Sequence, residues 1–140
     1  MLLESLTDAQ VDDISLWPEH MTKELIDYWA VKGAEDLHHS DIKSLNAKSA
    51  IQKGANSGIR KCTPALFTRR NRNGEDVIRS WLCFPPANGR VYCFFCQLIG
   101  VARSQLTHDG FCDWKHANDR LGAHEQSKDH IQAVFSAASR

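Results

Sequence analysis

Two short pairs of metal-binding residues constrain the fold of this chain more than any other feature. Cys93 and Cys96 are separated by two residues and His124 and His130 by five, with twenty-seven residues between the pairs. Two thiolates and two imidazoles form a tetrahedral ligand set for zinc, at about 2.3 Å to sulfur and about 2.0 Å to nitrogen. The sequence therefore predicts a zinc ion bound by these four side chains.

Each pair also makes a demand on its local structure. A regular strand sends residues three apart to opposite faces, so the two cysteines need a turn between them. Residues six apart on a straight helix differ by about 240° in direction, so one helix cannot present both histidines. Gly122 and Ser127 offer two places for a break. Such a break leaves His124 just after one helix and His130 in the first turn of the next.

Other cysteines and histidines are alternatives to this ligand set. A Cys-x2-Cys pair can be incidental, and a lone histidine is most often an ordinary surface or core residue. We expect the remaining thiols to be small buried side chains, although one of them lies opposite the cysteine pair and can replace a ligand. His38 and His39 have no cysteine near them and are interpreted as surface. The remaining thiols are those of Cys62, Cys83 and Cys112, of which Cys83 lies opposite the pair. The alternative ligands left open are Cys83, Cys112, His108 and His116.

The predicted secondary structure places the cysteines on a hairpin and the histidines on helices. The segments Val77–Phe84 and Arg90–Cys96 are rich in β-branched and aromatic residues and flank Asn88-Gly89, which is typical of a β-hairpin turn. A helical period follows Gly110. Its two apolar stripes are Trp114, Ala117 and Leu121, then, after Ser127, Ile131, Val134, Phe135 and Ala138.

The first part of the chain carries one predicted helix and a predicted linker. Thr22 is a good N-cap and Gly33 a good stop, with Leu25, Tyr28, Trp29 and Lys32 along one side. A shorter helical turn is indicated at Thr7–Gln10. Gly54–Gly58 has the composition of a flexible linker. We therefore predict an acidic segment over residues 1–59 and a small zinc-stabilised α+β domain over residues 60–140.

Charge divides the chain in the same place. The net charge of the 140 residues is zero, but residues 1–59 hold five Lys against ten acidic residues and residues 60–140 hold twelve basic against seven acidic residues. The two parts therefore carry −5 and +5. A basic domain favours contact with nucleic acid, although two solvated surfaces give the same split. The candidate phosphate-binding residues are Arg69, Arg70, Arg72, Lys115 and Arg120.

Length and composition exclude several classes of protein. A chain of 140 residues supports about one domain, so a large multidomain enzyme is excluded. No apolar run is long enough to cross a bilayer, and the acidic start lacks the basic region of a secretory signal. Five cysteines cannot all pair within one chain, which favours a reducing compartment and a metal site over a disulfide framework. We expect an intracellular protein.

Several motifs together resemble a known family, the TTF-type zinc finger. This domain is found at the N-terminus of hAT-type transposases and of domesticated relatives such as MYM-type zinc-finger proteins. The resemblance is dense from Asn71 to His130 and extends more loosely to the Leu16-Trp17-Pro18 segment. The motifs are Arg72-Asn-Gly-Glu75, Arg79-Ser-Trp81-Leu82, Val91-Tyr-Cys93-Phe-Phe-Cys96, Gly110-Phe-Cys-Asp-Trp114-Lys115 and Leu121-Gly-Ala-His124-Glu125-Gln-Ser127-Lys-Asp-His130.

The resemblance implies zinc held by the same four residues, a nuclear protein and a role in DNA binding. It also implies that Trp81 and Trp114 pack around the metal and do not stack on bases. In the relatives the finger is followed by a long catalytic region, whereas this chain stops ten residues after His130. We therefore expect a truncated, domesticated or incomplete member without enzymatic activity.

A closed zinc site with four protein ligands is structural, and its metal affinity is expected to fall on acidification because thiolates must form. The alternative function is a zinc-stabilised protein-interaction module in a nuclear complex. Its partner would dock on the aromatic hairpin or on the acidic helix around Trp29. A third interpretation is a fragment with no retained function.

Overall fold

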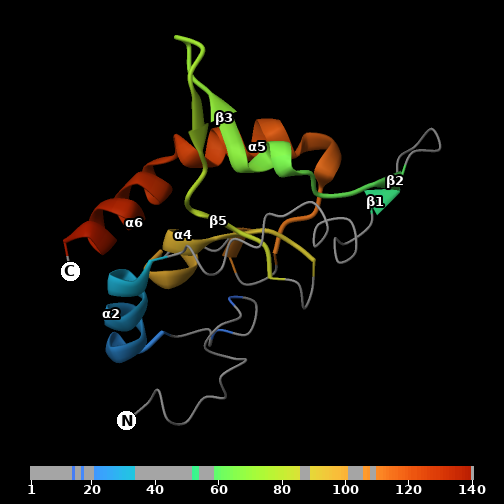
Figure 1. Ribbon diagram of the computed structural model, residues 1–140. Coiled ribbons are helices and arrows are strands. Elements are labelled where there is room, and N and C mark those ends of the chain that lie inside the picture. Colours follow the sequence, from blue (N-terminus) through green and yellow to red (C-terminus); the bar gives the residue numbers. More distant parts are fainter. Residues whose placement is uncertain are drawn as a thin grey trace.

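The computed structural model describes residues 14, 17, 21–33, 52–53, 59–85, 89–100, 106–107 and 110–139. Within these residues, short antiparallel ladders and helices alternate along the chain (Figure 1). The predictions at Thr7–Gln10, at His38 and His39, at Gly54–Gly58 and at His108 lie outside the described residues.

The predicted hairpin around the cysteine pair is present but shorter than expected. β5 (Leu82–Cys83) pairs with β6 (Tyr92–Cys93) in antiparallel register. The connection runs from residue 84 to residue 91, so it is not the tight two-residue turn that was predicted. Gly89 has φ of 69° and its N–H donates to the carbonyl of Pro85. Asn88 lies outside the described residues.

A second hairpin was not predicted. β3 (Thr68–Arg70) pairs with β4 (Asp76–Ile78), with Arg69 opposite Val77. The turn between them uses Gly74 at φ 87°, a conformation that glycine adopts without strain. Its chain reversal is closed by a hydrogen bond from Asn71 N to Glu75 O of 2.8 Å. Figure 1 shows this β3–β4 hairpin projecting from the rest of the molecule.

The helix predicted after Thr22 is confirmed. α2 (Lys23–Lys32) begins where the Thr22 hydroxyl accepts from Leu25 N, and it ends at Gly33, whose φ is 81°. Trp29 is completely buried, and its ring lies 6.4 Å from the ring of Phe94. α2 therefore packs on the part of the chain that holds the cysteine pair. The predicted division at residues 59 and 60 stays a prediction.

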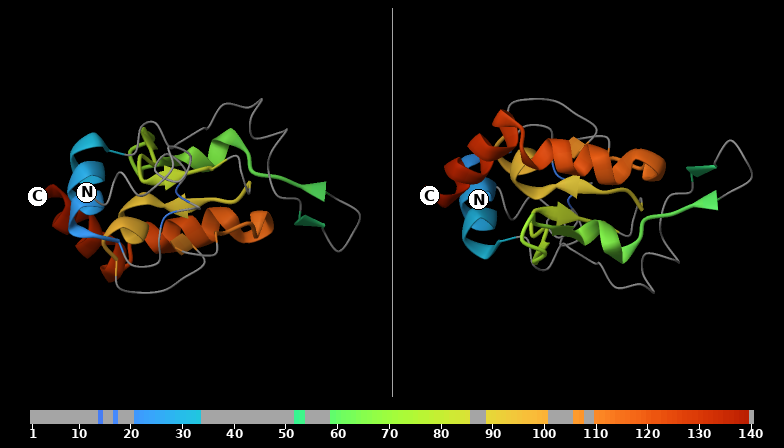
Figure 2. Two further views of the ribbon diagram at one scale, coloured as in Figure 1. Left: turned by 90° about the horizontal axis from the view of Figure 1, so that it is seen from below. Right: turned by 90° about the horizontal axis from the view of Figure 1, so that it is seen from above.

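Short ladders and a 3-10 turn lead into the main hairpins. β1 (Gln52–Lys53) pairs with β2 (Ile59–Arg60) on either side of the predicted linker, and the turn η4 (Pro64–Phe67) precedes β3. Figure 2 shows the β1–β2 ladder at one end of the molecule and α2 at the other, at the same end as the C-terminus. The residues just before the predicted linker are therefore paired with the residues just after it.

The helices of the C-terminal part follow the cysteine hairpin. A five-residue helix, α4 (Phe94–Leu98), comes directly after β6 and was not predicted. The 3-10 turn η6 (Trp114–His116) leads into α5 (Ala117–Glu125), and α6 (Lys128–Ala138) follows. As predicted, the side chains buried along the first stripe are Trp114, Ala117 and Leu121.

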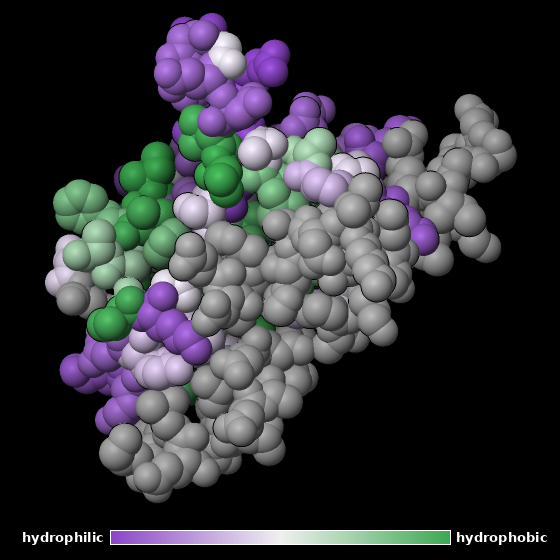
Figure 3. All heavy atoms as spheres, viewed as in Figure 1, coloured by the Kyte–Doolittle hydropathy of each residue, from purple (hydrophilic) through white to green (hydrophobic). Residues whose placement is uncertain are grey.

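The predicted inner stripe of α6 is wrong. The buried residues of this helix are His130, Ala133 and Ala137, whereas Ile131 is 55% exposed and Phe135 74% exposed. The helix packs on α4 through its small residues because His130 faces the cysteines. Its large apolar side chains therefore face outward (Figure 3).

Two adjoining groups of buried side chains form the core. One surrounds the cysteine and histidine pairs and includes Trp81, Phe84, Phe111 and Trp114. The other joins α2 to the hairpin through aromatic contacts, with Trp17 and Trp29 rings 5.3 Å apart. None of the described helices has the length and apolar character needed to span a lipid bilayer.

Candidate metal centre

The cysteine pair sits where a strand changes into a helix. Cys93 is the last residue of β6 and the N-cap of α4, and Cys96 lies within α4. The turn that the spacing required is therefore a strand-to-helix transition. Gly100 closes this segment, since its N–H donates to Cys96 O at 3.0 Å and an added Cβ would lie 2.5 Å from that oxygen. No larger side chain fits there without movement of the backbone.

The histidine pair spans a break between two helices, as predicted. α5 ends at Glu125 and α6 begins at Lys128. Ser127 holds both histidines: its hydroxyl donates to His124 O at 2.7 Å and accepts from His130 N at 3.2 Å. Two details of the prediction are wrong, because Gly122 lies inside α5 and His124 lies in its last turn, not after it.

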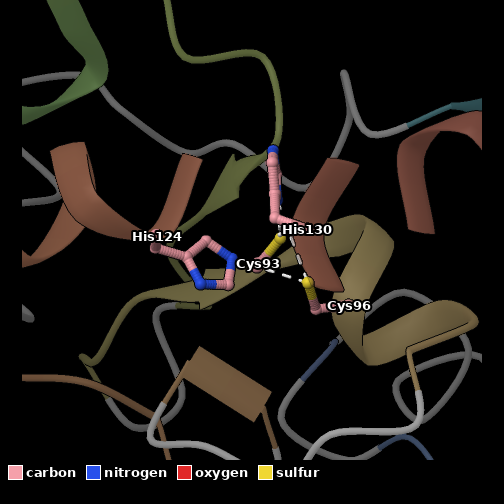
Figure 4. Close-up of side chains that lie close together, drawn as sticks. All are labelled: Cys93, Cys96, His124 and His130. Atoms are coloured by element: carbon pink, nitrogen blue, oxygen red, sulfur yellow. Dashed lines mark hydrogen bonds between the residues drawn. The ribbon is translucent and has the colours of Figure 1, made fainter. Parts of the chain in front are cut away.

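The four predicted ligand side chains converge on one point (Figure 4). Their ligand atoms all lie within 4.8 Å of one another. Cys93 Sγ is 3.3 Å from His130 Nδ1, and Cys96 Sγ is 3.5 Å from His124 Nε2 and 3.8 Å from His130 Nδ1. Tetrahedral zinc at standard bond lengths separates sulfur and nitrogen ligands by about 3.5 Å. The observed spacing fits that geometry.

Burial and the hydrogen bond between the two thiols set their protonation. Cys93 is fully buried and burial raises its pKa, while a hydrogen bond from the Cys93 thiol lowers the pKa of Cys96, with smaller contributions from the two histidines. Of the pair, Cys96 therefore carries the charge first. Zinc needs both sulfurs as thiolates, so metal binding displaces the proton of Cys93.

Trp81 packs against both histidine rings. The indole is 6% exposed and lies 5.3 Å from the His124 ring and 5.0 Å from the His130 ring, centroid to centroid. Trp114 is also buried in the same core. Both tryptophans are therefore packing residues, as the resemblance implied, and neither presents a face for stacking on bases.

A buried ion pair next to the zinc ligands was missed by sequence reasoning. Arg79 is 4% exposed; its guanidinium contacts the Glu125 carboxylate at 3.1 Å and donates to Leu66 O at 3.0 Å. Arg69 reaches the same carboxylate at 3.4 Å. Glu125 directly follows His124, so this arginine pair fixes the end of α5 that presents a ligand. The signal was a charged residue beside the ligand in the His-Glu-x-Ser motif.

The five predicted phosphate-binding residues lie in two separate regions, the β3–β4 hairpin and the η6–α5 segment. Arg69 and Arg70 lie on β3 and Arg72 in the turn that follows, all exposed, with Arg70 paired to Asp76 at 3.2 Å. Lys115 lies in η6 and Arg120 on α5, and both are exposed. Of these five, Arg69 pairs with Glu125, the residue next to the ligand His124.

The alternative ligands lie elsewhere among the residues that the structure describes. Cys62 and Cys83 are buried as predicted, and burial raises the pKa of Cys62 to about 12 and that of Cys83 further. Cys112 is half-buried and not fully buried as predicted, and the ring of His116 is paired with Asp113 at 2.9 Å on the surface. None of these four joins the described metal-ligating group.

Comparison with known proteins relates part of this chain to MYM-type zinc fingers. Over 73 residues it is 39% identical to zinc finger MYM-type protein 5 of Macaca fascicularis and 38% identical to the human protein, covering 51% of this chain and 11% of each relative. The mouse protein is 34% identical over 76 residues, or 54% of this chain and 12% of that protein. The chain thus spans a small part of these relatives.

No family model matches the chain, and no solved structure matches it. The similarity to MYM-type zinc fingers and the Cys2His2 cluster agree with each other. Together they identify a small α+β domain that binds zinc and is stabilised by it.

Proposed function

We propose that this chain is a structural zinc module that binds DNA, with zinc held by Cys93, Cys96, His124 and His130. The observation that carries the proposal is the closed cluster of four protein ligands, two of them thiols. A catalytic zinc keeps one position for water, whereas four protein ligands leave none. The ion then joins a strand end and three helices into one unit, and no enzymatic activity is expected.

The DNA-binding part of the proposal rests on charge and on resemblance. Residues 60–140 carry a net charge of +5, and the exposed basic residues Arg70, Arg72 and Arg120 lie on the outside of the zinc domain. Guanidinium groups pair with phosphate oxygens in two-point contacts. The TTF-type motifs add derivation from a hAT-type transposase and location in the nucleus, which we include in the proposal.

The contacts of Arg69 give it a different role. Its guanidinium is held by Glu125 and by the side chain of Asn71 at 2.9 Å. We therefore propose that Arg69 braces the β3–β4 hairpin against the metal centre, while Arg70 and Arg72 present charge to phosphate. Arg72 has no partner among the described residues, which leaves its guanidinium available.

A salt series with a charge-reversed variant tests this function. The binding of the zinc-loaded chain to a random DNA duplex is measured by fluorescence anisotropy at several salt concentrations. The logarithm of the affinity is expected to fall linearly with the logarithm of the salt concentration, with a slope of about −0.9 per phosphate neutralised. Arg70→Glu with Arg72→Glu should weaken binding and reduce the slope by about 1 for each arginine that contacts phosphate. These two side chains avoid the Glu125 contact, so the zinc centre should stay intact.

The matched control reverses two charges that lie away from Arg70 and Arg72. Lys23→Glu with Lys32→Glu changes the net charge equally but lies on α2, where both lysines are exposed. It should leave the slope unchanged. Equal weakening by both double variants, or no binding by the zinc-loaded wild type at low salt, would contradict DNA binding.

The aromatic side chains at the centre of the two docking surfaces foreseen for a protein partner are buried. Trp29 is completely buried, and the hairpin aromatics Phe84, Tyr92 and Phe94 are at most 1% exposed. A partner that docks on α2 would therefore contact its exposed side chains Tyr28 and Val31, and not Trp29.

A further inference from the structure

An apolar groove runs between the β3–β4 hairpin and α6, beside the zinc centre. A hollow of about 310 Å³ is lined by Val77 and Ile78 of β4, by Val134 of α6 and by His130. A second hollow along α6, of about 500 Å³, adjoins it through Gln126, which lines both. We call the two hollows together the β4–α6 groove. Figure 3 shows hydrophobic side chains gathered on this face of the molecule.

Large apolar side chains are exposed along this groove. Ile78 is 66%, Ile131 55% and Phe135 74% exposed, and each lines one of the two hollows. Single exposed apolar residues are ordinary, but a continuous set with a hollow between them is typical of an interaction site. Ile131 and Phe135 are one helical turn apart, so they present one ridge.

The groove also contains a hydrogen-bond donor that no described protein group accepts. His130 faces the sulfurs with Nδ1, and Figure 4 shows its other ring nitrogen on the opposite side of the ring. The side chain is 5% exposed, and Nε2 has no partner among the described residues. With zinc on Nδ1, Nε2 carries the proton. Metal-bound histidines usually donate this proton to a carboxylate, a carbonyl or water.

The backbone of β4 offers further unpaired groups. Arg79 N donates to Phe67 O and Asn71 N to Glu75 O, so the odd-numbered residues of this strand face β3. Asp76 and Ile78 therefore turn their backbone N–H groups to the other edge, which has no partner strand among the described residues. Ile78, whose N–H points to this free edge, also lines the groove, so the edge borders the groove at Ile78.

The charged groups of the groove are predominantly basic. Its lining holds Arg69 and Lys128 against one acid, Glu125. That carboxylate is already shared by Arg69 and the buried Arg79. The remaining positive charge attracts an acidic occupant.

We propose that the β4–α6 groove binds an extended peptide segment of a partner protein in which apolar and acidic residues alternate. The segment pairs its backbone with the free edge of β4 and places an apolar side chain between Ile78 and Val134. A backbone carbonyl or a carboxylate of the segment accepts the proton of His130 Nε2. This peptide-docking role goes beyond DNA binding and uses the β4 edge of the hairpin that also carries Arg70.

The chemistry of the groove favours an extended peptide over nucleic acid or a helical segment. Nucleic acid supplies no apolar side chains for Ile78, Ile131 and Phe135. A helical segment has its backbone groups paired internally and cannot satisfy the β4 edge. An extended acidic and apolar peptide matches the exposed edge, the N–H donor, the hydrophobic walls and the charge together.

A display selection with a random peptide library tests the proposal on the zinc-loaded full chain. We expect enriched peptides that alternate apolar and acidic residues and that bind Ile78→Asp at least tenfold more weakly than wild type. The control Val31→Asp changes an equally apolar, 85% exposed residue on α2 and should bind them unchanged. Circular dichroism and zinc content of both variants should match wild type, since both positions are exposed.

A second readout follows His130 directly. In an NMR titration with an enriched peptide, the Nε2 proton should move downfield as it enters a hydrogen bond, and the backbone amides of Asp76 and Ile78 should shift. The proposal is overturned if no peptide is enriched, if enriched peptides bind Ile78→Asp and wild type equally, or if the His130 proton does not move. A wild-type dimer that Ile78→Asp dissociates would assign the groove to a second copy instead and also overturn it.

Discussion

Removal of zinc is expected to unfold the chain after Arg60, with loss of most of its helical circular dichroism and of NMR signal dispersion. The four ligands come from the end of β6, from α4, from α5 and from α6, so the ion joins elements that are otherwise short. Structural zinc contributes about 10 to 16 kcal/mol of apparent binding free energy, against total stabilities of about 5 to 15 kcal/mol for ordinary domains. The metal therefore decides whether the fold exists.

Excess EDTA at neutral pH is the treatment, and zinc added back in excess is the control that should restore both signals. Because Trp29 packs on Phe94, the total tryptophan fluorescence of the chain should change in the same transition. The Cys112→Ser variant should respond as wild type does, since Cys112 lies outside the ligand group. A circular dichroism spectrum unchanged by EDTA would show that the core holds the fold without metal.

Glu125→Ala is expected to cost about 3 to 5 kcal/mol of unfolding free energy in the zinc-loaded protein, because it leaves the charge of Arg79 buried and unpaired. The Arg79 side chain is 3% exposed, and Glu125 is its ion-pair partner. The melting temperature should fall by more than about 10 °C in differential scanning calorimetry. Zinc affinity should fall as well, since Glu125 anchors the helix end that carries His124.

Two further variants separate the buried pair from general effects of charge. Asp76→Ala removes an exposed pair with Arg70, whose side chains are 73% and 62% exposed, and should cost at most about 1 kcal/mol. Arg79→Met with Glu125→Leu replaces both buried charges and should be less destabilised than Glu125→Ala alone. A Glu125→Ala protein as stable as the Asp76→Ala protein would contradict the role assigned to this pair.

The metal centre was predictable from sequence because its signals are local. The Cys-x2-Cys and His-x5-His spacings each demanded a break in regular structure, and Ser127 marked the break between the helices. The structure has a strand-to-helix transition at the first pair and a Ser127 N-cap at the second. The two ends of α2, at Thr22 and Gly33, were likewise predictable because capping is a property of a few adjacent residues.

Features that depend on distant contacts were not predictable. The apolar periodicity predicted that Ile131 and Phe135 face the core. In the structure, α6 is rotated so that His130 Nδ1 faces the sulfurs, and this orientation leaves both apolar side chains exposed. β3 escaped notice because Thr68–Arg70 is exposed throughout and shows no alternation. The Arg79–Glu125 pair joins residues 46 apart in sequence, which no local pattern connects.

Zinc K-edge X-ray absorption on the zinc-loaded chain tests the assigned metal centre most directly. We expect two sulfur ligands at about 2.3 Å and two imidazole nitrogens at about 2.0 Å, with one zinc per chain. The Cys96→Ser variant should lose a sulfur from this shell, and the Cys83→Ser variant should keep both. A shell of three sulfurs, or one containing a water oxygen, would contradict the closed Cys93, Cys96, His124 and His130 site.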